Sequence, residues 1–265
     1  MSTSSPDSSM GARLDRPTEP PARRLALIAG VLFILTFVTS IAAVVLYGPL
    51  LNHHAYINGG GADTRVLLGA FLELILIIAN IGTAVVLFPI LKQQHESLAL
   101  GFVAARIVES AFIAVGILSV LTVVTLRQDL AGGGSDPAVL DAVGRSLVAI
   151  HDWTFLLGPG FVVGIGNGLI LGYLMYRSGL VPRRMAMLGL VGGPLILASG
   201  TAVLFGVLEP GSVGQGIATI PEFLWELSLG IYLTVKGFKA SASTSAQTRQ
   251  PGVDDRPLIP AVAAP

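Results

Sequence analysis

Six long apolar stretches constrain the fold of this chain more than any other feature. The first of them, LALIAGVLFILTFVTSIAAVVLY, contains no charged residue. A helix needs about 20 apolar residues to cross the hydrocarbon core of a bilayer, and a backbone inside that core must satisfy its N–H and C=O groups internally. A membrane barrel would instead show alternating strands of about ten residues, and these runs do not alternate. We therefore expect an all-α integral membrane bundle of six transmembrane helices.

The charged content agrees with this interpretation, because charged residues make up 12% of the chain against about 25% in a soluble domain. The expected spans are residues 25–47, 66–91, 98–124, 149–176, 185–208 and 219–238. We expect residues 22–239 to form the membrane domain, and the polar segments 1–21 and 240–265 to be disordered cytoplasmic tails. The first span is longer than the apolar core of a secretory signal, about 7–15 residues, so we expect it to be uncleaved.

The placement of lysine and arginine predicts the orientation. With the N-terminus inside, three basic residues fall in outer loops: Arg65, Arg127 and Arg145. Twelve fall on the cytoplasmic side: Arg13, Arg16, Arg23, Arg24, Lys92, Arg177, Arg183, Arg184, Lys236, Lys239, Arg249 and Arg256. Both termini are therefore expected to be cytoplasmic.

Local signals refine the expected helices. Asp136 before Pro137 is a helix-start signal, and we expect a helix to begin there, lie along the outer surface and then turn into the fourth span. The pairs Gly158-Pro159 and Gly193-Pro194 are expected to bend the fourth and fifth spans. Glycines that recur every four residues predict a smooth stripe for close helix packing. They are Gly160, Gly164, Gly168 and Gly172.

Two opposite charges, Arg106 and Glu109, lie inside the third span. Each central charge costs about 2.5–3.5 kcal/mol, and each central Leu, Ile, Phe or Val returns about 0.3–0.6 kcal/mol. Residues 98–123 contain fourteen such apolar side chains, so the return of about 4–8 kcal/mol barely covers the cost of about 5–7 kcal/mol. These charges need a partner, either each other or a group on a neighbouring helix.

The other spans supply candidate partners, and we expect a polar cluster in the outer half of the bundle. Glu222 is expected near the interface, and Glu226, one turn deeper, is the preferred functional carboxylate. The expected cluster is Glu73, Arg106, Glu109, His151, Asp152, Glu222 and Glu226. Carboxylates outnumber bases in it, so some must pair, take up a proton or bind a cation. The alternative is that these groups are hydrogen-bonding glue between helices.

Several classes of function lack support in the sequence. The formal net charge of zero argues against a nucleic-acid binder, and the absence of cysteine excludes disulfides, thiolate metal sites and a cysteine nucleophile. One histidine with several carboxylates could ligate a divalent metal, but the spacing matches no zinc motif. We predict no metal and no cofactor.

Several segments together resemble a known family. They are ARRLALIAGVLFILTFVTSI, LALGFVAARIVES, VAIHDWTFLLGPG, YRSGLVPRRMAMLGLVGGP and PEFLWELSLGIYLTVKGF. Their order and spacing resemble the bacterial family called domain of unknown function 4386, from about Ala22 to Phe238. The resemblance implies a multi-pass protein of the bacterial plasma (inner) membrane. It supplies no catalytic role for any residue.

Three functions stay open at this point. The preferred hypothesis is a protein that binds or transports a small cation, a proton or a small polar molecule through the intramembrane cluster. The second is a structural or accessory membrane subunit. The third is an intramembrane enzyme that uses His151 and the carboxylates. The lipid bilayer is the predicted partner, and protein partners and oligomeric state stay open.

Overall fold

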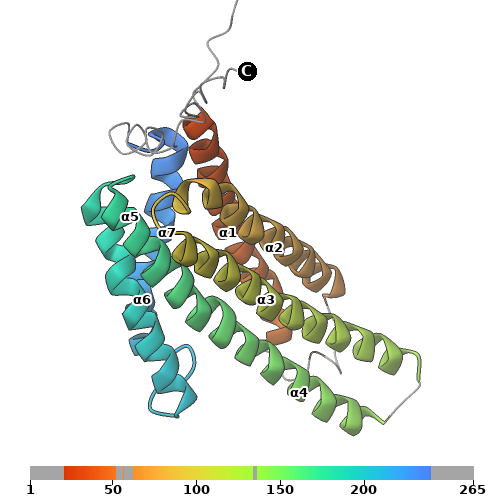
Figure 1. The fold of residues 1–265 in the computed structure, drawn as a ribbon. Helices are drawn as coiled ribbons and strands as arrows, with labels where there is room; N and C mark the ends of the chain where they lie inside the picture. The colour runs from red at the N-terminus through yellow and green to blue at the C-terminus, as the bar shows by residue number, and fades with distance from the viewer. Residues whose placement is uncertain (1–20, 52–55, 57–61, 134–135, 240–265) are drawn as a thin grey trace, which may run out of the picture.

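The computed structural model describes residues 21–51, 56, 62–133 and 136–239, and these residues form a bundle of long helices (Figure 1). The predicted tails 1–20 and 240–265 lie outside the described residues, and Pro21, placed in the tail by the sequence, is the first residue of a helix. The described part of the chain contains helices and connections only, as an all-α bundle requires.

The elements, in chain order, are α1 (Pro21–Leu51), α2 (Asp63–Leu91), α3 (Glu96–Ala131), α4 (Pro137–Phe155), the π-helices η1 (Leu156–Val162) and η2 (Gly164–Leu171), α5 (Gly172–Ser178), α6 (Arg183–Leu204) and α7 (Val213–Val235). The elements from α4 to α5 join end to end into one helical rod, Pro137–Ser178.

These rods run up and down in sequence. The start of α1, the α2–α3 turn, the α5–α6 turn and the end of α7 lie at one end of the bundle, and the other connections lie at the opposite end (Figure 1). Successive rods pack against each other, and α7 packs against α1. The helices therefore form a closed ring around a central space.

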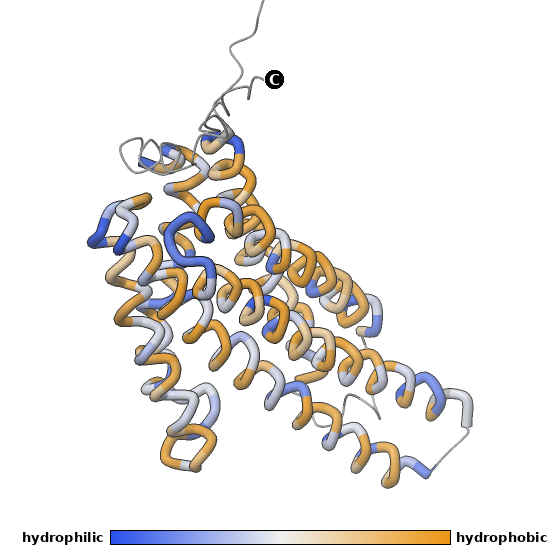
Figure 2. The backbone as a smooth tube through the Cα atoms, in the orientation of Figure 1, coloured by the Kyte–Doolittle hydropathy of each residue, from blue (hydrophilic) through white to orange (hydrophobic). Residues whose placement is uncertain are grey.

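The surface of this ring is apolar. Hydrophobic positions follow each helix along most of its length, and the most hydrophilic positions gather mainly near the ends (Figure 2). Large aliphatic side chains in mid-helix face outward, with Val38, Ile78 and Leu118 61%, 70% and 65% exposed. A soluble monomer rarely exposes apolar patches of this extent, so lipid is the natural neighbour of this surface.

Five helical segments of the described chain are long and apolar enough to cross a membrane. They are Ala22–Leu51, Asp63–Leu91, Glu96–Leu130, Pro137–Ser178 and Arg183–Leu204. The expected sixth span corresponds to α7, which has 23 residues. That length reaches about 35 Å at 1.5 Å per residue, but Glu222 and Glu226 lower its apolar character.

The fourth rod differs from its prediction. Asp136 caps it as expected, accepting a hydrogen bond from the Ala138 N–H at 2.9 Å with Pro137 in the first turn. The expected turn along the outer surface is wrong, because the helix continues through Phe155 and packs against α3. Around Pro159 the helix changes to π geometry. Proline has no N–H to donate and clashes with a carbonyl of the preceding turn, and the wider i→i+5 pattern accommodates it.

The core consists of two apolar clusters separated along the helices. One cluster, nearer the end with the chain termini, includes Phe33, Leu87 and Phe102. The other, nearer the opposite end, includes Ala43, Leu76 and Ile113. Between them, each of α1, α2 and α3 carries buried polar groups. These are Thr36, Thr39, Asn80, Thr83, Arg106, Glu109 and Ser110. The bundle therefore encloses a polar layer near mid-depth.

Candidate functional site

A central cavity of about 180 Å³ opens within this polar layer. Side chains of α1, α2, α3, α4, η1, α6 and α7 line it. Six of the seven predicted cluster residues are among them: Glu73, Arg106, Glu109, His151, Glu222 and Glu226. Ionisable groups from four helices, α2, α3, α4 and α7, thus face one space.

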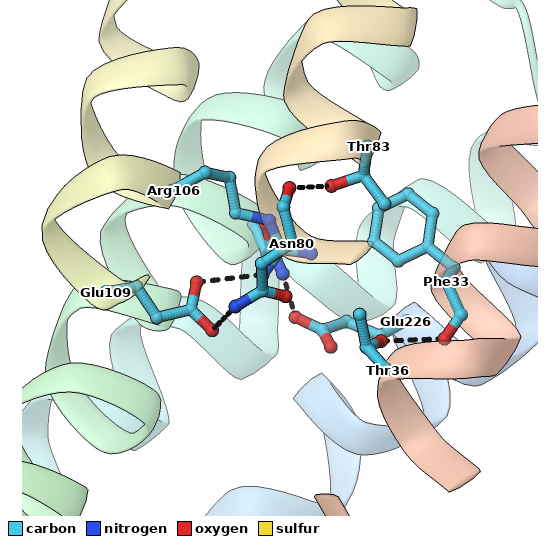
Figure 3. A network of polar contacts seen from close by, with 8 residues as sticks. Phe33, Thr36, Asn80, Thr83, Arg106, Glu109 and Glu226 are labelled. Atoms are coloured by element: carbon cyan, nitrogen blue, oxygen red, sulfur yellow. Dashed lines mark hydrogen bonds and ion pairs between the residues drawn. The ribbon is translucent and has the colours of Figure 1, made fainter. Parts of the chain in front are cut away.

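The centre of the site is an ion pair on α3 that is also bonded to α2. Arg106 Nη1 donates to Glu109 Oε2 at 2.8 Å, and Asn80 Nδ2 donates to Glu109 Oε1 at 2.8 Å. Figure 3 shows these side chains and Glu226 pointing toward one another. Arg106 is 2% exposed, and its Nε and Nη2 atoms have no hydrogen-bond partner. The edge of the guanidinium that carries Nε and Nη2 can therefore interact with other negative groups.

A second carboxylate, Glu73, is held by α1. The Tyr47 hydroxyl donates to Glu73 Oε2 at 2.8 Å, and both side chains are buried. The Tyr47 ring also meets the His151 ring edge to face, with ring centres 5.7 Å apart. This contact brings α1, α2 and α4 together at the outer side of the cavity.

The Glu222 side chain packs tightly between η2 and α6. Gly168 and Gly192 flank it, since a Cβ on either residue would lie within 2.8 Å of Glu222 Oε2. The residue is 2% exposed, and neither carboxylate oxygen has a hydrogen-bond partner. The close α6–α7 contact at Gly192 therefore encloses this carboxylate within the protein, and its location near the membrane interface stays a prediction.

Glu226, one turn further along α7, is partly buried and accepts a hydrogen bond from the Asn167 side-chain amide. The backbone carbonyl of Asn167 in turn accepts a hydrogen bond from the Trp225 indole N–H at 2.9 Å. Glu226 and Glu222 both lie close enough to Arg106 for their charges to act on it. A single guanidinium thus faces three glutamates.

Asp152 does not belong to this group. Its side chain is 62% exposed and lies 3.6 Å from His151, measured from Oδ1 to Nδ1. It lines a separate cavity of about 250 Å³ at the end of the bundle where α1 ends and α4 begins, together with Tyr56, Asp141 and Arg145. We call it the outer cavity, after the side of the membrane on which the sequence places it. The neighbouring residues 151 and 152 therefore face different cavities.

The outer ends of α2 and α3 are joined by a cluster around Asp63. Arg127 and the Tyr56 hydroxyl both donate to Asp63, the hydroxyl at 2.7 Å. Burial raises the pKa of Tyr56 well above its ordinary value, and the hydrogen bond to Asp63 raises it further. Tyr56 therefore stays a neutral donor at physiological pH.

The four glycines of the predicted stripe do not share one environment. A Cβ at Gly164 or Gly168 would collide with the backbone of α6 at Gly193, and one at Gly172 would touch α6 at 3.3 Å. A Cβ at Gly160 would meet only its own helix. Three of the four glycines therefore pack against α6, two from η2 and one from the start of α5.

Sequence reasoning did not assign Tyr47 or Asn167 to the site. Asn167 is a lone amide in the apolar run GFVVGIGNGLILG, and a buried amide needs a partner, so that signal was present. Tyr47 carries no comparable signal at the end of an apolar run. Among the described residues, no three His, Asp or Glu side chains are grouped so as to hold a metal ion.

The fold and the cavity define a multi-pass helical membrane protein with a charged site buried near mid-depth. The chain belongs to the family described as domain of unknown function (DUF4386), whose profile matches residues 28–237, so the resemblance seen in the sequence is confirmed. Comparisons with curated proteins and with solved structures found no match. The family description assigns no activity, and the function has to be inferred from the site.

Proposed function

We propose that the protein carries protons across a bacterial plasma membrane through the central cavity, with Glu222 and Glu226 as the proton-binding groups. The observation that carries this proposal is the environment of Glu222. Its carboxylate is buried among helices, and neither of its oxygens has a hydrogen-bond partner.

The energetics favour a group that changes its charge. A charged side chain at the centre of a bilayer costs about 2.5–3.5 kcal/mol on insertion scales, and an unpaired buried polar group adds about 1–3 kcal/mol. Arg106 offsets part of the negative charge, but it already binds Glu109 directly. Glu222 and Glu226 face the same guanidinium, so three glutamates share one positive charge. Uptake of a proton removes the surplus charge without requiring new space.

A proton fits the site better than a larger cation does. The oxygens of Glu222 are buried, and Oε2 lies against Gly168 of η2 and Gly192 of α6, so a metal ion or an ammonium group needs the packed helices to move before it can reach them. The described residues also lack a grouping of three metal-binding side chains. A proton can reach the carboxylate through transient water alone.

The topology needed for transport is part of the proposal. We infer six spans with both termini in the cytoplasm, with α7 as the sixth. Supporting this, four basic residues lie at or next to the α2–α3 and α5–α6 turns, at the end of the bundle where α1 begins: Lys92, Arg177, Arg183 and Arg184. Basic residues accumulate on the cytoplasmic side of membrane proteins. The two glutamates of α7 face the cavity rather than lipid, so they do not prevent this helix from spanning.

Proton flux into liposomes tests the proposal. The purified protein is reconstituted with a trapped pH-sensitive dye, and a potassium gradient with valinomycin sets the membrane potential. We expect acidification in the presence of the wild-type protein, and strong loss of it in Glu222→Gln and Glu226→Gln. Glu209→Gln is the matched control, because Glu209 is exposed between α6 and α7. Wild-type flux equal to that of protein-free liposomes would refute the proposal.

A structural or accessory role is the second candidate, and the interhelical bonds favour it. Asn80 to Glu109 ties α2 to α3, and Tyr47 to Glu73 ties α1 to α2. In this case charge-removing variants would lower the yield of folded protein and change no flux. The double swap Arg106→Glu with Glu109→Arg would then recover yield, because the pair is made within one helix at spacing i, i+3.

A further inference from the structure

The central cavity and the outer cavity are separated at one place by two consecutive residues of α4. His151 lines the central cavity, and Asp152 lines the outer cavity. The His151 ring is buried at 6% exposure, whereas the Asp152 side chain is 62% exposed. The distance from His151 Nδ1 to Asp152 Oδ1 is 3.6 Å. An imidazole thus stands between a solvated carboxylate and the buried glutamates.

We propose that His151 passes protons from the outer cavity to the central cavity, with Asp152 attracting them on the outer side. This inference rests on the proposed function, since it supplies the outer access route for the same protons. Imidazole suits the task because it gains and loses a proton near neutral pH and carries one nitrogen on each side of its ring.

The transfer balances with one proton in and one proton out. A proton arriving near Asp152 binds His151 Nδ1, which lies 3.6 Å from Asp152 Oδ1. This nitrogen is buried and has no hydrogen-bond partner. The imidazolium then releases the proton on Nε2 toward the glutamates of the central cavity, with water as carrier where a gap exists. A rotation of the ring by about 180° about its bond to Cβ then turns the unprotonated nitrogen back toward Asp152, and this nitrogen binds the next proton. No bond between heavy atoms changes.

The groups packed around the imidazole make this transfer favourable. Tyr47 on α1 presents its ring edge to face, and Glu73 on α2 accepts a hydrogen bond from the Tyr47 hydroxyl and lines the same cavity as His151. On α3 the neighbour is Gly116, which has no side chain and would contact the ring if a Cβ were present. On α4 the charged neighbour is Asp152. Asp152 at 3.6 Å is therefore the carboxylate that stabilises a positively charged imidazolium intermediate from its own helix, and Glu73 faces the same cavity as the ring.

The outer cavity adds a further feature. Its remaining charged groups are Asp141 and Arg145, which bind each other at 2.8 Å. This pair is neutral as a unit, so Asp152 supplies the unpaired negative charge of that cavity among the described residues. A proton entering from outside is accordingly directed to the carboxylate next to His151.

The test uses the liposome assay with three variants. His151→Gln keeps a polar side chain of similar size but cannot be protonated, and we expect it to lose about 10²-fold in flux, the low end of the effect of a positioned proton-transfer group. Asp152→Asn changes an exposed side chain, and we expect about a tenfold loss, as for one partly screened charge interaction. His95→Asn is the control, because His95 is exposed and caps α3 with a side-chain acceptor that Asn also provides.

Chemical rescue separates proton transfer from packing. In His151→Gly, added imidazole should restore flux, since it fills the space and replaces the titratable group, while added benzene of similar shape should not. If His151 served only to pack against Tyr47, imidazole and benzene would either both restore flux or both fail to restore it. Rescue by imidazole alone supports the inference.

Each outcome gives a decision. If the wild-type protein carries protons and His151→Gln carries them equally fast, the role of His151 is overturned and the proposed function stands. Wild-type flux equal to protein-free liposomes overturns the proposed function, and the access route with it. If His151→Gln fails to fold, Asp152→Asn decides, and undiminished flux in that variant overturns the inference.

Discussion

The close contact between α6 and α7 at Gly192 allows a sharp test of the structure. In Gly192→Ala the new Cβ would lie 2.5 Å from the Glu222 backbone nitrogen and 2.7 Å from both its Cα and its Oε2. Ordinary contacts of carbon lie at about 3.5–4.0 Å. The two helices must therefore separate by about 1 Å, and the backbone atoms involved cannot rotate away.

Overpacking of this kind costs about 1–3 kcal/mol, and we place Gly192→Ala at the upper end because the obstacle is backbone. For a chain of this size each kcal/mol lowers the melting temperature by about 2–4 °C, which gives a decrease of about 4–12 °C. The control is Gly216→Ala in the same helix hairpin, since a Cβ there meets nothing within 4 Å. Replacing a helical glycine in open space stabilises by about 0.5–1 kcal/mol.

Thermal unfolding in detergent, followed by the amount of monodisperse protein that survives heating, measures both variants. From lowest to highest, the expected order of melting temperatures is Gly192→Ala, wild type and Gly216→Ala. A Gly192→Ala protein that melts at or above the temperature of Gly216→Ala would show that α6 and α7 do not approach each other as described. The enclosure of Glu222 would then be lost as an argument.

Three other predictions follow from single contacts. Asn80→Ala removes the amide that donates to Glu109 and should destabilise by about 0.6–1.7 kcal/mol, the range for interhelical bonds in membranes; an unchanged melting temperature would contradict it. Asp136→Ala removes the cap of α4 and should cost about 0.5–2 kcal/mol, with Asp136→Asn as the neutral control. The chain has no cysteine, so Glu209→Cys should react with an impermeant maleimide on intact cells and Gln94→Cys only after permeabilisation; the reverse pattern would invert the topology.

The positions of the helices could be predicted because lipid makes apolar length visible in the sequence. The expected span 66–91 corresponds to α2, which runs from Asp63 to Leu91. The expected span 98–124 lies within α3, and this helix continues to Ala131. Charged residues such as Arg127 look like loop in a hydropathy pattern, yet here Arg127 binds Asp63 and remains within the helix.

The site could be predicted only in part. Charges in apolar runs identified Arg106 and Glu109, because each is costly enough to need a reason. Their partners were less visible, since a helix that is apolar all round gives no periodicity from which to read its rotation. The burial of Glu222 depends on glycines of two other helices, and no pattern within α7 carries that information.

The wide-turn geometry between Leu156 and Leu171 makes the length of this segment critical. Each i→i+5 bond encloses one residue more than an ordinary helical turn. Deleting a single residue before Asn167 would let the segment relax to regular α geometry and swing its amide by about 100° around the axis, since an α-helix has 3.6 residues per turn. Glu226 would lose the amide donor described above, so in this stretch the number of residues matters to the site as well as their identity.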